Sequence, residues 1–257
     1  MKPNDNSYLT RHSYFLVSLA EALLAAGCST HRLEDRIERL CIAKGLEGEI
    51  LIVPTGVQLQ LKHRTAHIIC FVRVKKLGIK LSLLHNLSDF CDEIVRTGVG
   101  TRLAEKQLDK ILELPDPYPQ SLIIVCFSVV STFFQFMLGG GVYDCLLCAL
   151  LGIVVYFSER YFSNAKQASF LSNFVSAFLV SSLCIWYQKV FHIESIQLVI
   201  LSGIIILTPG LGLTNSIAEL SHRQFLSGSA RFIEALLVLL FISFGVYLPL
   251  QLFGVSL

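Results

Sequence analysis

The sequence predicts an α+β cytoplasmic domain at residues 1–118, followed by an α-helical membrane bundle of about five transmembrane helices at residues 119–257. Thirty of the forty Asp, Glu, Lys and Arg residues lie in the first part. The proline-rich segment 115–119 marks the change, and the uncharged run Ser121–Met137 follows it. The whole chain is 53% hydrophobic and 16% charged, whereas about a quarter of the residues in a typical soluble domain are charged.

The first part has helical patterns on both sides of a strand pattern. Apolar residues at helical spacing begin at Leu9 and stop at Gly27, which suits a helix C-cap. Ser29 or Thr30 can then cap a second helix. The next segment is rich in β-branched residues and partly alternates apolar and polar side chains, as a half-buried strand does. In order, the sequence predicts helices over 9–26 and 30–44, strands over 49–53, 57–62 and 67–74, and helices over 81–96 and 101–114.

The turn between the first two predicted helices gathers a hydroxyl, an imidazole and a guanidinium group. A C-cap followed by an N-cap explains Gly27 and Ser29 or Thr30, but it does not explain His31 and Arg32. The alternative is a hydrolytic site formed by Ser29 or Thr30 with His31 and Arg32. The sequence offers no complete catalytic triad and no metal-ligand set beside them. We therefore expect no enzyme, no metal and no cofactor.

Charge and cysteine usage exclude several other classes of protein. The sixteen basic and fourteen acidic residues of the first part are mixed, which describes a solvated surface and not a nucleic-acid interface. The eight cysteines either lie in apolar runs or lack paired spacing, so we expect reduced thiols. The polar residues 1–11 do not form a signal peptide. We therefore expect the first part to stay in the cytoplasm.

The second part contains five apolar segments, and short-loop charges predict their orientation. Lys and Arg concentrate in cytoplasmic loops. With the first part inside, the inner connections hold Arg160, Lys166, Arg223 and Arg231, and the outer connections hold Lys189. An odd number of spans places residue 257 outside. The predicted spans are 120–138, 142–158, 168–187, 196–213 and 232–253.

Polar residues within or beside these spans are the candidate substrate-binding groups. Pro209 removes a backbone donor inside the fourth span, and transporters use such breaks to present backbone groups to a substrate. A simple helix end at the interface is the alternative. Polar residues of the third span form a stripe, which either lines a pathway or packs helices closely. The candidates are Asp144, Ser172, Asn173, Ser176, Thr208, Pro209, Gly210, Asn215 and Arg231.

An ordered set of short motifs resembles the N-terminal component of the threonine/serine exporter family, including short bacterial members that act in succinate export. The resemblance covers almost the whole chain. It implies a cytoplasmic domain with about five membrane helices, and a second module of about four helices that long members carry in the same chain. The motifs are Gly27-Cys28-Ser29-Thr30-His31-Arg32, Pro54-Thr55-Gly56, Gly139-Gly140-Gly141 with Asp144, Thr208-Pro209-Gly210, Asn215-Ser216 and Ser227-Gly228-Ser229-Ala230-Arg231.

The resemblance and the composition together predict a subunit of an exporter in the bacterial inner membrane. The substrates expected are small polar metabolites, either threonine/serine-type amino acids or dicarboxylates such as succinate. The chain lacks the phosphate-binding loop GxxxxGK[ST], so export would be secondary. The expected partners are the lipid bilayer, the small-molecule substrate and a small integral membrane protein of about four helices, with a higher oligomer left open and no nucleic acid. The rival hypotheses are a membrane-anchored hydrolase and a sensor.

Overall fold

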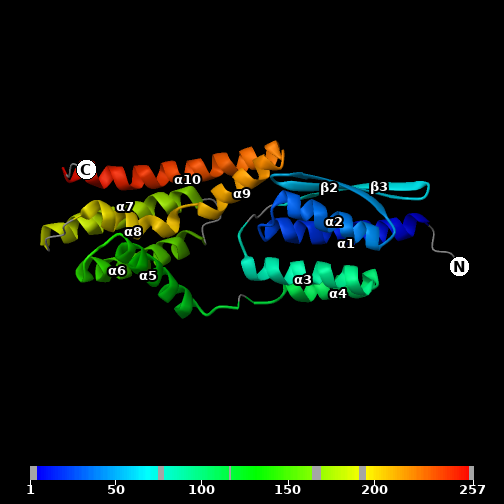
Figure 1. The fold of residues 1–257 in the computed structure, drawn as a ribbon, viewed down its shortest axis with the longest axis horizontal. Coiled ribbons are helices and arrows are strands. Elements are labelled where there is room, and N and C mark those ends of the chain that lie inside the picture. The colour runs from blue at the N-terminus through cyan, green and yellow to red at the C-terminus, as the bar shows by residue number, and fades with distance from the viewer. Residues whose placement is uncertain (1–4, 75–77, 116, 164–168, 191–194, 255–257) are drawn as a thin grey trace. The chain divides into compact units, whose positions relative to one another are not determined.

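The computed structural model describes residues 5–74, 78–115, 117–163, 169–190 and 195–254 (Figure 1). These residues form two compact units. Unit 1 comprises Met1–Pro117 together with Thr214–Arg231, and unit 2 comprises Tyr118–Leu213 together with Phe232–Leu257. Each unit is therefore built from two separate stretches of the chain.

The first stretch of unit 1 forms three layers. An antiparallel sheet with strand order β1-β2-β3 is covered on one face by α1 and α2, and α3 and α4 pack on the far side of these helices (Figure 1). The helices and strands expected from the sequence are present. Their bounds are α1 Asp5–Ala25, α2 Thr30–Ala43, β1 Glu47–Val53, β2 Gly56–His63, β3 Ala66–Arg73, α3 Leu81–Thr97 and α4 Thr101–Leu112.

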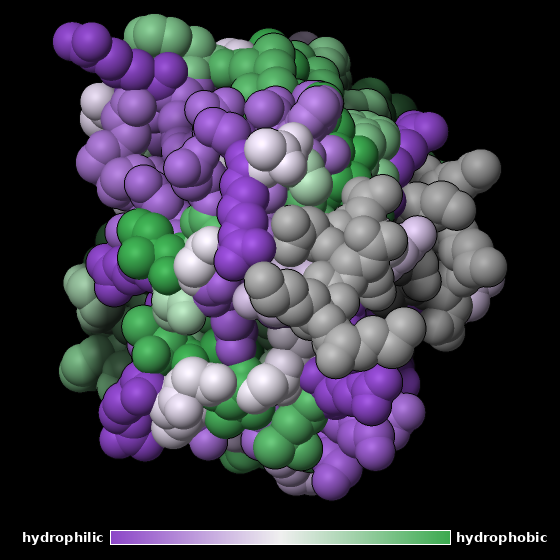
Figure 2. All heavy atoms as spheres, turned by 90° about the vertical axis from the view of Figure 1, so that its right-hand side faces the viewer, coloured by the Kyte–Doolittle hydropathy of each residue, from purple (hydrophilic) through white to green (hydrophobic). Residues whose placement is uncertain are grey.

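Alternation along the strands gives the sheet one buried and one open face. On β2, Val57, Leu59 and Leu61 are fully buried against the helices, and burial of one such side chain contributes about 1.5–3 kcal/mol. On the open face, Ile69 and Phe71 of β3 are exposed. Figure 2, which faces unit 1, shows hydrophilic and hydrophobic residues side by side. The core of unit 1 therefore lies on the helical side of the sheet.

Two glycines fix the turns that the sequence motifs marked. Gly27 has a φ of +93°, and a Cβ atom there would lie 2.8 Å from the carbonyl oxygen of Gly78, so an L side chain would be both strained and crowded. Gly56 begins β2 after the turn at Pro54 and Thr55, and its Cβ would lie 2.9 Å from the carbonyl oxygen of Val72. Both motifs therefore have a structural role.

Unit 2 is a helical bundle whose helices have the length and composition of membrane spans. Within the described residues, four helices are long and apolar enough to cross a bilayer, and a fifth span results if α8 with η1 and α9 is counted as one broken span. The two parts of that pair meet at an angle of 61°. The bounds are α5 Gln120–Met137, α6 Val142–Ser163, α7 Ser169–Val190, α8 Ile196–Ile204, η1 Ile205–Leu207, α9 Gly210–Ser221 and α10 Phe225–Leu252.

The structure corrects the predicted fold class. Helices account for 75% of the described residues, and the sheet has only three strands, so the protein is mainly helical and not an α+β domain followed by a bundle. In addition, unit 1 takes in most of α9 and the beginning of α10. Local hydropathy assigned every residue after 118 to the membrane, because it does not detect contacts between distant segments. Where the bilayer lies with respect to residues 118 and 119 stays a prediction.

Candidate functional site

Buried polar side chains join α5 to α8 inside unit 2. Ser131, Gln135 and Ser202, which we call the α5–α8 polar cluster, are at most 1% exposed. The Ser202 hydroxyl donates to Gln135 Oε1 at 2.7 Å. The Ser131 hydroxyl has no hydrogen-bond partner within the described ranges. Gly140 makes room for Gln135, because a Cβ there would lie 2.2 Å from the Gln135 amide nitrogen. None of these three residues is among the candidates that the sequence predicted.

A second set of polar contacts joins α6 to α7. The Ser176 hydroxyl donates to Ser158 Oγ at 2.9 Å, and the Ser172 hydroxyl donates to Glu159 Oε1 at 2.6 Å. We call these the α6–α7 polar pairs. The predicted stripe on the third span thus places Ser172 and Ser176 in a helix–helix contact, whereas the half-buried Asn173 belongs to neither pair. These contacts satisfy polar groups in apolar surroundings, where an unpaired group is costly.

The predicted break of the fourth span is present at Thr208 and Pro209. The hydroxyl of Thr208 donates to the carbonyl of Ile205, and the amide of Gly210 donates to the carbonyl of Thr208 at 2.8 Å. A Cβ at Gly210 would meet nothing within 4 Å. The missing amide hydrogen of Pro209 is therefore the stronger physical reason for the break, and Gly210 is not required there by space.

The predicted substrate-binding residues lie at several separate places. Asp144 is half-buried in the first turn of α6, where a carboxylate interacts favourably with the helix dipole. Ser172 and Ser176 face α6, and the break lies at the start of α9. Asn215 and Arg231 belong to unit 1. Their roles in substrate binding stay predictions.

In unit 1, the N-terminus of α2 is capped by a side chain from a distant part of the chain. Ser29 is the N-cap residue, but its side chain makes no capping hydrogen bond. Instead, the amide of Thr30 donates to Glu219 Oε1 at 3.1 Å. Glu219 is 1% exposed, and its Oε2 lies 3.5 Å from Arg231 Nε. Arg231 also donates to the carbonyl oxygen of Cys28 at 3.2 Å.

Further contacts surround this arrangement, which we call the α2 cap site (Cys28, Thr30 and Glu34 with Glu219, Gln224 and Arg231). Gln224 Nε2 donates to Glu34 Oε2 at 2.7 Å. Burial raises the pKa of Glu34, and the hydrogen bond from Gln224 opposes that rise. Beside them, the rings of His31 and His222 stack with centroids 4.2 Å apart. Charged and polar groups from two distant segments therefore meet at one helix end.

The structure shows where the polar side chains of the motif at residues 27–32 lie. His31 stacks on His222, and Arg32 is exposed. Neither Ser29 nor Thr30 forms a hydrogen bond with His31 in the part of the chain that the structure describes. The geometry therefore does not support the hydrolytic alternative at this turn.

Elsewhere in unit 1, a threonine hydroxyl lies beside a buried imidazole, a pair that the sequence did not predict. Thr101 Oγ1 lies 2.9 Å from His12 Nε2, and His12 Nδ1 lies 2.8 Å from the carbonyl oxygen of Tyr8. His12 and Thr101 are 6% and 7% exposed. Burial is the main reason that the pKa of His12 is lowered. Because the pair is enclosed and each nitrogen has a partner, it satisfies buried polar groups rather than facing a substrate.

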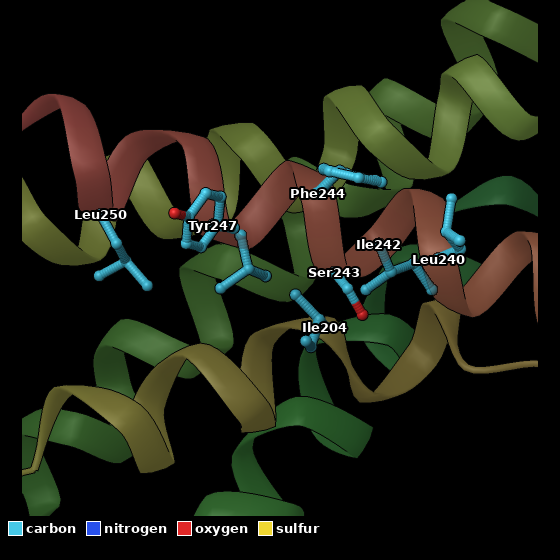
Figure 3. Close-up of a pocket in the computed structure, with 8 residues that line it drawn as sticks. Ile204, Leu240, Ile242, Ser243, Phe244, Tyr247 and Leu250 are labelled. Carbon is cyan, nitrogen blue, oxygen red and sulfur yellow. The ribbon is translucent and has the colours of Figure 1, made fainter.

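An apolar groove lies between α8 and α10 in unit 2. Its volume is about 730 Å³. Figure 3 shows Ile204 of α8 opposite side chains of α10, among them Ile242 and Ser243. The lining is almost wholly hydrocarbon, so the groove suits lipid chains or an apolar helix rather than a polar metabolite.

Comparisons with known proteins give a consistent family assignment. Residues 14–253 match the family described as "Putative threonine/serine exporter". "Pheromone-regulated membrane protein 10" of Yarrowia lipolytica is 24% identical over 96% of this chain and 21% of its own length. The protein of that name from Kluyveromyces lactis is 25% identical over 96% of this chain and 26% of its own length.

A protein of Schizosaccharomyces pombe, "Uncharacterized protein C7D4.12c", is 24% identical over 96% of this chain and 33% of its own length. The chain thus spans between a fifth and a third of the length of these relatives. No solved structure matches it. Since the family match covers nearly all of both units, and since unit 2 has the helices of a membrane protein, the chain is a membrane protein that belongs to the threonine/serine exporter family.

Proposed function

We propose that this protein is a subunit of a secondary exporter of small polar metabolites, either threonine/serine-type amino acids or dicarboxylates such as succinate. The family match supports transport as the activity. The observation that carries the proposal is the α5–α8 polar cluster: hydroxyl and amide groups are buried among helices that are otherwise apolar. A polar substrate that crosses a bilayer needs such groups in place of water, because hydrocarbon offers no hydrogen bonds.

The test is export from loaded cells by variants of this cluster. Gln135→Leu should abolish release of labelled threonine, serine or succinate while the protein stays abundant in the membrane. Ser181→Ala is the matched control, since Ser181 is also a fully buried hydroxyl but donates only to backbone carbonyls, those of Ala177 and Gly245. Normal export by an abundant Gln135→Leu variant would rule out the cluster as part of the path.

A separate small membrane protein of about four helices would complete this exporter. A pathway needs enough helices to shield it from lipid, and the described part of the chain supplies four spans, or five if the bent pair counts as one. The apolar groove between α8 and α10 is a surface of the kind that a partner helix covers. Co-expression with such a protein should restore export that this chain alone lacks. Robust transport by the purified chain alone in liposomes would contradict this part of the proposal.

The proposed location is a bacterial inner membrane, with unit 1 facing the cytoplasm. Arg160, Arg223 and Arg231 lie on the proposed inner side and Lys189 on the outer side, as the positive-inside rule requires. Lys166 lies outside the described residues. The length of α10 is compatible with this placement. Its 28 residues extend about 42 Å, more than the hydrocarbon thickness of about 30 Å, so its first turns can stand outside the bilayer. A C-terminal reporter fusion that is active only in the cytoplasm would contradict the proposed orientation.

A further inference from the structure

We propose that the N-terminus of α2 is a carboxylate-binding site of the exporter, which Glu219 occupies in this structure and from which the carboxylate of a small metabolite displaces it. The ligand class is a small carboxylate, which amino acids and dicarboxylates share. This inference rests on the proposed function for its physiological ligand. The geometry of unit 1 supports it independently.

The first step is that this helix end already binds a carboxylate. The first amides of a helix have no partner within the helix, and the helix dipole favours an anion there. Ser29 occupies the N-cap position and could satisfy one amide, but its side chain does not do so. Glu219 does so from a position 189 residues away. A carboxylate therefore replaces the ordinary local cap.

The second step is that Glu219 leaves the site incompletely satisfied. Among the described residues, Glu219 Oε2, Thr30 Oγ1 and Gln224 Oε1 are buried and lack a hydrogen-bond partner. Thr30 is 2% exposed, so water does not solvate its hydroxyl in place of a protein group. Buried polar atoms normally have partners. Glu219 Oε2 still has its ion pair with Arg231, so two atoms beside the carboxylate remain without any partner in the described part of the chain. The Thr30 hydroxyl can donate to a ligand carboxylate, and Gln224 Oε1 can accept from the ammonium group of an amino acid.

Charged side chains surround the start of α2. Burial is the main reason that the pKa of the Cys28 thiol is raised, and the guanidinium groups of Arg36, Arg32 and Arg231 oppose that rise. The start of α2 also holds the carboxylates of Glu219 and Glu34 close to the guanidinium group of Arg231. Arg231 is ion-paired with Glu219 but its side chain is 22% exposed, so an incoming anion can reach it. A small carboxylate that binds here would replace Glu219 as the anionic partner of Arg231 and of the Thr30 amide.

The site is connected along the chain to helices that have the composition of membrane spans. Glu219 lies on α9, which begins immediately after the break at Thr208 and Pro209, and Arg231 lies on α10. A ligand that takes the place of Glu219 removes the direct hydrogen bond between α9 and the N-terminus of α2. Arrival of a carboxylate would then weaken, at one contact, the attachment of the second half of the broken span to α2.

The experiment measures binding of threonine, succinate and acetate to the purified full chain by calorimetry. Glu219→Gln keeps the size of the side chain but removes its negative charge, so it competes less well for the site. We expect the Kd for succinate or threonine to fall by at least about tenfold in this variant. Adding Arg231→Gln to Glu219→Gln should remove that gain. The control is Asp35→Asn, which neutralises a carboxylate on α2 that pairs only with Arg39 in the described structure and should leave the Kd unchanged.

A second measurement covers the case in which Glu219→Gln does not fold. Acetate should raise the Tm of Glu219→Ala more than that of the wild type, because it refills the vacated position. In the wild type, Arg231→Gln should weaken binding of the same carboxylates. A residue with only a structural role would lower the Tm without raising carboxylate affinity.

The outcomes separate this inference from the proposed function. An unchanged or higher Kd in folded Glu219→Gln, or no effect of Arg231→Gln on binding, overturns the inference even if the cells export normally. Tighter binding in Glu219→Gln without export in any background upholds the site and contradicts the exporter. Threonine and succinate titrated in parallel identify which source of carboxylate the site prefers.

Discussion

The α2 cap site of unit 1 and the α5–α8 polar cluster of unit 2 satisfy buried polar groups in different ways. The α2 cap site uses full charges, a glutamate against a guanidinium and a helix N-terminus. The polar cluster uses only hydroxyl and amide groups. Charges are far more costly than neutral polar groups in a bilayer. The difference teaches that the buried charge of the α2 cap site needs a cation and a helix end as partners, whereas the neutral groups of the α5–α8 polar cluster need only hydrogen bonds.

A second difference lies in what holds the helices together. In unit 2, glycines allow close contact: a Cβ at Gly152 would lie 2.5 Å from the carbonyl oxygen of Phe127, and a Cβ at Gly245 would lie 2.5 Å from that of Phe174. Lipid gives apolar helices little reason to associate, so small residues that admit close packing take over that role. In unit 1, Gly228 similarly allows α9 and α10 to approach, but charged contacts tie that hairpin to α2.

The largest effect should come from a larger side chain at a close contact between two helices of unit 2. Gly245→Leu places a side chain against the backbone of α7, which cannot move aside as a flexible side chain can. We expect a loss beyond the usual cost of about 1–3 kcal/mol for overpacking, seen as little folded protein in detergent. Gly210→Leu is the control, because its Cβ would meet nothing. Equal yields of both variants would contradict the packing argument.

The next largest effect should come from removing the buried carboxylate of Glu219 in unit 1. Glu219→Leu leaves the amide of Thr30 without its acceptor and Arg231 without its anion. We expect a loss of about 3 kcal/mol, in the range for breaking a buried ion pair, measured as a lower Tm of the purified chain. Glu234→Leu is a control at an exposed glutamate on α10. A Tm within error of the wild type would show that Glu219 contributes nothing to stability.

A smaller effect should follow from removing a neutral polar contact in unit 2. Ser176→Ala breaks the hydrogen bond to Ser158. Hydrogen bonds between membrane helices are worth on average about 0.6 kcal/mol, so the Tm should fall only slightly. Comparison with Glu219→Leu sharpens the contrast between the two units. A loss as large as that of Glu219→Leu would remove the distinction between charged and neutral contacts.

The smallest effect should be a pH dependence from His12. Its pKa is lowered in the folded state, mainly by burial, from an ordinary value of 6.5. The unfolded chain therefore takes up a proton at a higher pH than the folded chain. The contribution of the buried, neutral His12 to the free energy of unfolding is fully present above about pH 6.5 and is lost as the pH falls below that value.

Thermal unfolding between pH 7.5 and pH 5 checks the His12 prediction. The fall in Tm should be smaller in His12→Asn than in the wild type. His85→Asn serves as the control, since His85 is largely exposed. If His12→Asn shows the full wild-type fall in Tm, the histidine is not the source of the pH dependence.

Short-range patterns predicted much of the local structure. The C-cap at Gly27, the turn before Gly56 and the break at Pro209 each depend on the backbone properties of one residue. The candidate site was predicted less well. Gln135 was overlooked within an apolar run, because its burial depends on Gly140 and on Ser202, 67 residues later.

The sequence by itself therefore determined the local elements and the apolar helices, because hydropathy, capping residues and helix breakers act over a few neighbouring residues. Only the tertiary structure decided that Thr214–Arg231 joins unit 1 and that Glu219 caps α2. The physical reason is that the partners of a buried charge are chosen by proximity in space. No local pattern indicates that a glutamate and a helix end 189 residues apart will share one hydrogen bond.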